Sequence, residues 1–242
     1  MSNDAGINDQ MRRAPPFTWN GARNGAIRIM PLVPTVVMYG VAFGVLAAAA
    51  GLSMPEAVLF SGLVNAGAAQ MASLQAWSNP VPILAVVLTT VGMNARYLLL
   101  GATLRPWLAG LPSRQVYASL FVMGDGNWAL AHREHALGRD DAAFIAGSGA
   151  VLWVAWVSAT AVGHAFGNVI VQPERFGIDF MLAAFFASMA VSFFRHARDL
   201  LPLAAGAVSA IAFERLVPGP WYLLVGAITG SVFAALRYHA AR

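Results

Sequence analysis

Six hydrophilic side chains stand inside stretches of sequence that are otherwise apolar. They belong to three consecutive apolar runs and are Asn65, Gln70, Asn94, Arg96, Asp125 and Asn127. A guanidinium and a carboxylate can form a charge-assisted ion pair, and amides both donate and accept hydrogen bonds. The pattern therefore predicts an ion pair between Arg96 and Asp125, beside a polar site that the four amides line.

The composition indicates that these runs lie in a lipid bilayer. Hydrophobic residues make up 58% of the 242 positions, and charged residues make up only 11%, against roughly 25% in an average soluble domain. A helix that crosses the hydrocarbon needs about 20 mostly apolar residues. Windows of sufficient length without any Asp, Glu, Lys or Arg occur at 29–54, 57–95, 142–173 and 216–236.

The expected fold is all-α, a bundle of transmembrane helices, because the runs are continuous and lack the alternation of membrane strands. Eight spans are predicted, with seven as the alternative and with some spans broken or re-entrant. Residues 1–22 are expected to be a disordered cytoplasmic tail, and residues 23–242 a single transmembrane domain. The predicted spans are 27–50, 55–77, 81–104, 115–131, 142–168, 177–194, 200–215 and 219–237.

The arginines between the runs predict the orientation, because cytoplasmic loops carry an excess of Lys and Arg. They place both termini, the 132–141 loop and the loop before the seventh span in the cytoplasm. One loop disagrees, since Arg105 and Arg114 would lie outside. The disagreement indicates an error among the second to fourth spans, one of which is a candidate for a re-entrant segment.

Five of the six hydrophilic residues, all except Gln70, fall at one depth, about 15 Å from the ends of their spans at 1.5 Å per residue. A charged side chain at the centre of a membrane helix costs about 2.5–3.5 kcal/mol. Arg96 and Asp125 are therefore expected to face a cavity or a partner. The alternative is a buried polar cluster that only holds helices together.

Two stretches, 65–70 and 124–127, look unfit for regular helix. Broken helices expose backbone groups that can bind a substrate carboxylate or ammonium, so Ala66 and Gly67 join the predicted substrate site. For these two residues the alternative is small-residue packing. Asp125 and Asp179 are predicted to couple an ion, although Asp179 could instead cap its helix. Arg96 could bind either Asp125 or a substrate carboxylate.

Other features have simpler interpretations. Three glycine pairs with GxxxG spacing indicate close helix packing: Gly40 and Gly44, Gly163 and Gly167, Gly226 and Gly230. His164 is expected to be structural, with a proton relay as the alternative. The absence of cysteine excludes thiolate chemistry and cysteine metal sites. His132 and His135, with Glu134 between them, have the spacing of a metal pair but are assigned to a charged loop, so no metal is expected, and no cofactor is expected either. The net charge of +4 is attributed to topology and not to nucleic-acid binding.

Several motifs resemble those of the AzlC family, the large subunits of two-component branched-chain amino acid exporters. They begin at Gly40, Gly51, Ala66 and Leu88, and the last is followed by Asn94-Ala-Arg96; a later one covers Gly177-Ile-Asp179-Phe180. The resemblance extends over about residues 20–237. Two departures are evident: Tyr97 follows Arg96 where the family usually has His, and Gly126 replaces an acid after Asp125.

The resemblance implies a permease of the bacterial inner membrane that exports valine, leucine, isoleucine or methionine. It also implies a small AzlD-type membrane subunit as partner and a proton or another ion as the coupling species. The residues expected to line the substrate site are Asn65, Ala66, Gly67, Gln70, Asn94, Arg96 and Asn127. The alternatives are a non-transporting assembly subunit and an intramembrane enzyme, although no Ser–His pair or carboxylate–His cluster supports catalysis.

Overall fold

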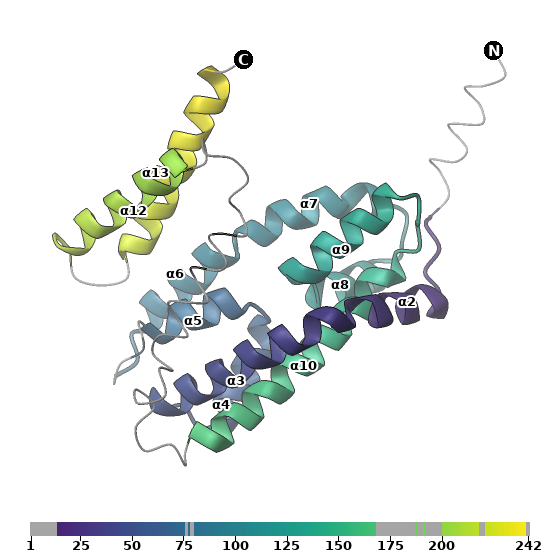
Figure 1. Cartoon of the computed structure of the whole chain (residues 1–242), viewed down its shortest axis with the longest axis horizontal. Helices are drawn as coiled ribbons and strands as arrows, with labels where there is room; N and C mark the ends of the chain where they lie inside the picture. The colour runs from purple at the N-terminus through teal and green to yellow at the C-terminus, as the bar shows by residue number, and fades with distance from the viewer. Residues whose placement is uncertain are drawn as a thin grey trace.

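The fold was analysed in a computed structural model, which describes residues 14–75, 77, 80–167, 187, 191, 200–217 and 221–240. Every regular element among these residues is a helix (Figure 1). In chain order they are α2 (Trp19–Ile29), η1 (Met30–Leu32), α3 (Val33–Ala49), α4 (Met54–Val64), α5 (Gly67–Gln75), α6 (Ile83–Asn94), α7 (Arg96–Leu108), α8 (Ser113–Phe121), α9 (Asp125–Ala136), α10 (Ala143–Gly167), α12 (Leu200–Glu214) and α13 (Trp221–Ala240).

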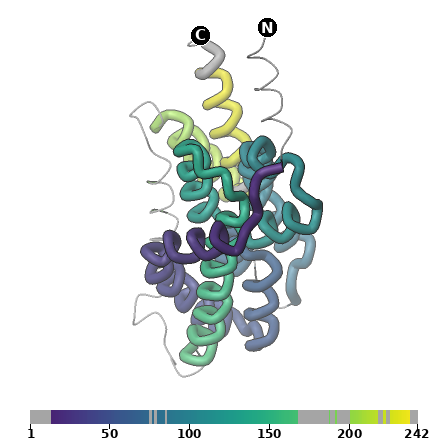
Figure 2. Tube along the Cα trace, turned by 90° about the vertical axis from the view of Figure 1, so that its right-hand side faces the viewer, coloured from purple at the N-terminus to yellow at the C-terminus, as the bar shows by residue number. Residues whose placement is uncertain are grey.

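Two long apolar elements form the centre of the fold. The continuous segment from α2 to α3 has 31 residues and α10 has 25, and both are long and apolar enough to cross a membrane. They lie side by side and run in the same direction (Figures 1 and 2). Glycines allow the close approach: a Cβ on Gly44 would collide with the backbone of α10, and one on Gly163 with the backbone of α3. The packing role predicted for these glycines is confirmed.

One end of the molecule gathers segments that are distant in sequence. The Thr18 hydroxyl, just before α2, donates to the Asp141 carboxylate before α10. Trp107, near the end of α7, donates from Nε1 to the Asp140 carbonyl at 2.8 Å, and its ring stacks on His135 with centroids 4.9 Å apart. The 109–112 turn therefore lies at the same end as the start of α2. We call the end of the molecule that holds the start of α2, the 109–112 turn and residues 139–141 the arginine-rich end.

The opposite end is formed by the turn between α3 and α4 and by the end of α10. His164 of α10 lies 2.7 Å from the Leu52 carbonyl through Nε2. The contact is buried and ties the end of α10 to a turn 112 residues away in sequence, which agrees with the structural role expected for His164. At the same turn, the carboxylate of Glu56 accepts hydrogen bonds from the backbone N–H and the hydroxyl of Ser53. This is a capping box, which a serine followed three residues later by a glutamate predicts from the sequence alone.

Helices α4 and α5 form a hairpin that turns back halfway along α10. Helix α4 leaves the turn at Leu52 and ends at Val64. After the turn, Gln70 of α5 contacts Trp156 near the middle of α10. Beyond α5, the ring of Trp77 lies 6.4 Å from that of Phe60 in α4, so the chain returns to the end from which it came.

Helices α8 and α9 form a second such hairpin, which enters from the arginine-rich end. At its tip, the Phe121 ring lies 6.4 Å from that of Trp153 in α10, and Val122 abuts Gly149. Helix α9 then runs back, and its residue His135 stacks on Trp107 as described above. The two hairpins thus enter from opposite ends and meet at mid-depth.

These hairpins correct the predicted spans. The spans predicted at 55–77 and 115–131 are each interrupted by a turn and reverse direction, so two of the second to fourth spans are re-entrant where one was a candidate. Between them, α6 and α7 cross from one end to the other. Arg105 and Arg114 therefore lie at the same end as Arg133 and Arg139, and the conflict in the charge pattern disappears.

Two boundaries also change. Helix α2 begins at Trp19, whereas the predicted tail extends to residue 22. Helix α9 continues to Ala136, so residues predicted to form a charged loop belong to a helix. The predicted span at 177–194 lies outside the described residues, apart from two isolated helical positions.

Helices α12 and α13 pair with each other and contact α6 through α13 (Figure 1). Their interface is lined by Gly206, Gly226 and Gly230, and a Cβ on Gly226 would come within 2.9 Å of the Gly206 carbonyl. This agrees with the packing role predicted for the third glycine pair. Many of the outer side chains of this pair are exposed and apolar, including Val208 and Ile228.

The hairpin arrangement predicts how introduced cysteines react, and the chain offers a background without any cysteine. In membrane vesicles, Ser113→Cys and Ala136→Cys should react with an impermeant maleimide from the same side, because both positions are exposed at the arginine-rich end. Ala49→Cys should react only from the opposite side. If Ser113→Cys were labelled from the same side as Ala49→Cys, the result would contradict the hairpins and support uninterrupted crossings at 55–77 and 115–131.

Candidate functional site

The predicted ion pair between Arg96 and Asp125 is present. Nη2 of Arg96 lies 2.8 Å from Oδ2 of Asp125, and the two side chains keep 23% and 45% of their surface exposed. Both residues are the first of their helices, α7 and α9, and the guanidinium also lies 5.2 Å from the centre of the Tyr97 ring. The pair is thus positioned by two helix starts and remains partly accessible.

Asn65 joins the tips of the two hairpins. Its backbone adopts the left-handed conformation, with φ 43° and ψ 37°, which asparagine tolerates better than most residues. This ends α4 and allows the chain to reverse. The side-chain Nδ2 donates to the carbonyl of Phe121 at 3.3 Å, so the turn of one hairpin contacts the last residue of α8.

Asn94 lies immediately before the interruption between α6 and α7. Its side-chain Oδ1 is buried and has no hydrogen-bond partner within the described part of the chain. A buried acceptor without a donor is costly, by about 1–3 kcal/mol. Such an atom beside a charged pair is suited to accept a hydrogen bond from a ligand or a water molecule.

Gln70 has a different position from the residues around the ion pair. It is fully buried, accepts from Nε1 of Trp156 at 2.9 Å and donates to the Ser61 hydroxyl at 3.1 Å. The Ser61 hydroxyl is in turn 2.8 Å from that of Thr160. Both polar atoms of Gln70 are thus used in tying α5 to α4 and α10, which is the helix-joining alternative considered for this residue.

Asn127 is also fully buried, and its contacts organise the second hairpin. Its Oδ1 accepts from the backbone N–H of Gly124 at 2.6 Å, and its Nδ2 donates to the Ile145 carbonyl at 3.2 Å. The first contact satisfies a backbone donor at the turn before α9, and the second attaches the hairpin to α10. Asn127 thereby fixes the residue two positions earlier, Asp125.

The remaining predicted site residues do not gather at the ion pair. Ala66 is buried, and a Cβ on Gly67 would lie 2.7 Å from the Trp156 ring, so the contacts of both favour the packing alternative. Asp179 lies outside the described residues, and its predicted role is not addressed by the structure. The described chain contains no group of three or more His, Asp or Glu side chains arranged to bind a metal.

Three interruptions of helix therefore come together, and two of them overlap the predicted irregular stretches 65–70 and 124–127 in part, since residues 67–70 and 125–127 are helical. The turn at Asn65 and Ala66 and the turn at 122–124 are the tips of the hairpins, whereas the interruption at Ala95 was not predicted. Ala95 has ordinary helical dihedrals, and no glycine or proline marks it in the sequence. Ser61, Thr160 and Trp156 were also missed, because small hydroxyls and tryptophans are ordinary constituents of apolar helices.

Chemically, the site combines charges of both signs with the ends of several helices. The starts of α7 and α9 offer partial positive charge, and the ends of α6 and α8 offer carbonyl oxygens. Such a set can hold a small molecule that carries both an ammonium and a carboxylate.

Comparison with known proteins identifies relatives that match most of the chain. The profile described as AzlC protein matches residues 31–170. The chain is 26% identical to the Inner membrane protein YgaZ of Escherichia coli K12, over 86% of this chain and 87% of that protein. It is 24% identical to an uncharacterized membrane protein of Archaeoglobus fulgidus, over 88% and 93% of the two chains. No solved structure matches it.

The buried contacts of Gln70 predict a loss of stability when they are removed. Gln70→Ala leaves the Trp156 N–H and the Ser61 hydroxyl without this partner, so the free energy of unfolding should fall by about 1–3 kcal/mol. Thermal unfolding of the purified protein in detergent measures the change. The control is Asn24→Ala on the exposed face of α2, which should change stability by less than about 0.5 kcal/mol. Equal effects of the two substitutions would contradict the assignment.

Proposed function

Because the chain belongs to the AzlC protein family, we propose that it is the large subunit of a secondary transporter that exports branched-chain or similar apolar amino acids. Its substrates would be valine, leucine, isoleucine or methionine. The observation that carries the proposal is the Arg96–Asp125 pair, which stands where two helices begin near mid-depth of the molecule. The relatives are membrane proteins by their names, and this chain is a membrane protein too.

The accessibility of the pair supports binding over a purely structural role. Gln70 and Asn127 are completely buried, but Arg96 and Asp125 are not. Charged surface that faced hydrocarbon would be costly, so the exposed parts are expected to contact water, a substrate or a partner subunit. The carboxylate of an amino acid can replace Asp125 as the partner of Arg96, and its ammonium can replace Arg96 as the partner of Asp125. No charge is then left unpaired.

The arrangement of the hairpins supports transport. Transporters commonly place their binding sites near the middle of the bilayer, at discontinuous helices that belong to inverted structural units. Here a full-length element followed by a hairpin occurs twice: α2–α3 with α4–α5, then α6–α7 with α8–α9. The second unit runs opposite to the first. The site lies where the tips of the two hairpins meet.

Further parts of the proposal rest on the family resemblance and the charge pattern. The protein would reside in the bacterial inner membrane, cross it several times and keep both termini in the cytoplasm. It would require a small AzlD-type subunit, and a proton or another ion would drive export. The residues at or beside the substrate would be Asn65, Asn94, Arg96 and Asn127. Asp125 and Asp179 would take part in ion coupling. Ala66, Gly67 and Gln70 would support the site through packing.

Arg96→Ala should lower export of labelled amino acids about tenfold or more, because a charge-assisted hydrogen bond contributes about 1.5–3 kcal/mol. The measurement is efflux of labelled valine, leucine, isoleucine or methionine from cells that express the chain with its small partner. Arg114→Ala is the matched control, since Arg114 is exposed at the arginine-rich end. Membrane insertion of all variants is checked by their amount in the membrane fraction.

Two outcomes would overturn the proposal at different points. Full export by Arg96→Ala would remove the assignment of the site but leave the activity. No stimulated efflux of any of the four amino acids, with or without the partner, would remove the substrate class. Reconstitution of both subunits in vesicles then separates a transporter from an assembly subunit, which would give no flux.

A further inference from the structure

A second charged cluster lies at the arginine-rich end, away from the mid-depth ion pair. It forms a cavity of about 340 Å³, within the range of small-molecule sites, which is about 300–1,000 Å³. Three arginines, one glutamate and two leucines line the cavity: Arg28, Leu130, Arg133, Glu134, Leu137 and Arg139. The helices that supply them are α2 and α9, together with the turn after α9.

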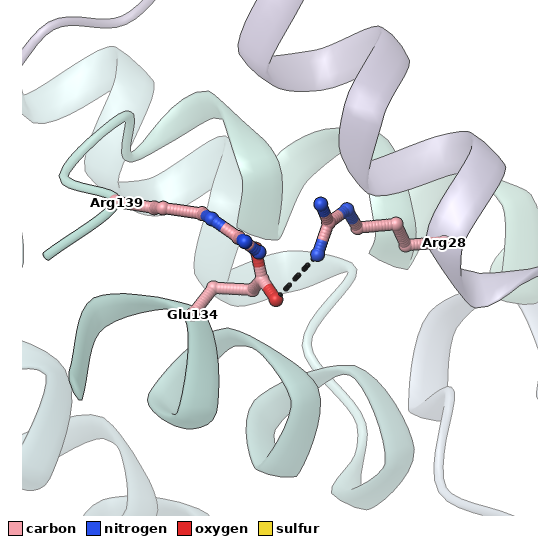
Figure 3. Close-up of polar contacts among 3 residues, drawn as sticks. All are labelled: Arg28, Glu134 and Arg139. Atoms are coloured by element: carbon pink, nitrogen blue, oxygen red, sulfur yellow. Dashed lines mark hydrogen bonds and ion pairs between the residues drawn. The ribbon is translucent and has the colours of Figure 1, made fainter. Parts of the chain in front are cut away.

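Glu134 fixes two of the arginines in place. Its side chain is only 5% exposed, and its two oxygens accept from Nη1 of Arg28 and Nη1 of Arg139, each at 2.7 Å (Figure 3). Each guanidinium carries five N–H donors, and these contacts use one from each. The other donors can therefore bind a further anion in a geometry that is already set.

The cavity keeps an excess of positive charge. Three arginines and one carboxylate give a formal charge of +2, and a single glutamate cannot neutralise them. Within the described chain, Arg133 makes no ion pair or side-chain hydrogen bond, although it lines the same space. A phosphate group matches this combination in charge and in its ability to accept several hydrogen bonds from guanidinium groups.

The depth of the cavity indicates the kind of molecule that carries the phosphate. Arg28 precedes the end of α3 at Ala49 by about 21 residues, or roughly 32 Å of helix, which is close to the hydrocarbon thickness of about 30 Å. Arg28 therefore lies at the level of lipid headgroups if Ala49 lies at the opposite boundary. The adjacent Leu137 is 60% exposed and would contact the apolar part of an amphiphile.

We propose that this cavity binds the phosphate of an anionic phospholipid headgroup. Basic pockets of this kind on the cytoplasmic side of membrane proteins recognise such headgroups. Bound lipid would bridge α2, which lies against α10, to the second hairpin. The inference does not depend on the identity of the transported substrate.

The test compares lipids on the purified full-length protein in a neutral detergent. Phosphatidylglycerol or cardiolipin should remain bound in native mass spectra and raise the melting temperature, whereas phosphatidylcholine and inorganic phosphate at the same concentration should not. Arg133→Gln should weaken binding of the anionic lipid about fivefold, the change expected for one arginine at a membrane surface. It removes no contact of Glu134, so the fold should be retained.

Arg23→Gln is the matched control, because Arg23 is an exposed arginine of α2 outside the cavity, and it should leave binding unchanged. Equal loss in the two variants would show unspecific surface attraction and overturn the proposal. So would equal retention of phosphatidylcholine. Stabilisation by inorganic phosphate as strong as by lipid would assign the cavity to a free anion instead.

Discussion

The need to satisfy backbone polar groups away from water governs this structure. In hydrocarbon each unpaired N–H or C=O costs several kcal/mol, so helices can be interrupted only where protein covers the break. Here the breaks at the two hairpin tips lie against α10. Asn127 supplies an acceptor for the Gly124 N–H and a donor for the Ile145 carbonyl, and Asn65 supplies a donor for the Phe121 carbonyl. The asparagines thus make the breaks possible, and the breaks position the charges.

Packing around the breaks separates two apolar clusters. One gathers at the arginine-rich end around Trp107 and Ile145, and the other at the opposite end around Phe43 and Trp156. The hairpin tips lie between them, beside Gly149 and Trp153 of α10. Polar groups are concentrated at one level because the apolar residues of both hairpins are already packed on either side of it.

Sequence alone predicted the elements whose signal is local. The length of α10 follows from a long stretch without charge, the turn at Asn65 from a cluster of small and polar residues, and the capping box from Ser53 and Glu56. The Arg96–Asp125 pair was predicted because two charges in apolar runs each need a partner. The charge pattern indicated a re-entrant segment among the second to fourth spans but not which spans reverse, because a re-entrant helix and half of a spanning helix have the same composition. The direction depends on contacts with α10, such as that of Gln70 with Trp156, which lie 86 residues apart.

The two charged clusters differ in a way that fits their depths. Glu134 is buried and holds both Arg139, five residues away, and Arg28, 106 residues away in sequence. No local pattern reveals the contact with Arg28, and the arginines of this cluster carry a surplus of positive charge. Arg96 and Asp125 form a balanced pair, as a site deeper in the membrane requires. Each hairpin is attached to α10 by buried hydrogen bonds, whereas the bond between the hairpins from Asn65 to Phe121 is long, at 3.3 Å. The hydrogen bond between the tips is also exposed, whereas the bonds that attach the hairpins to α10 are buried.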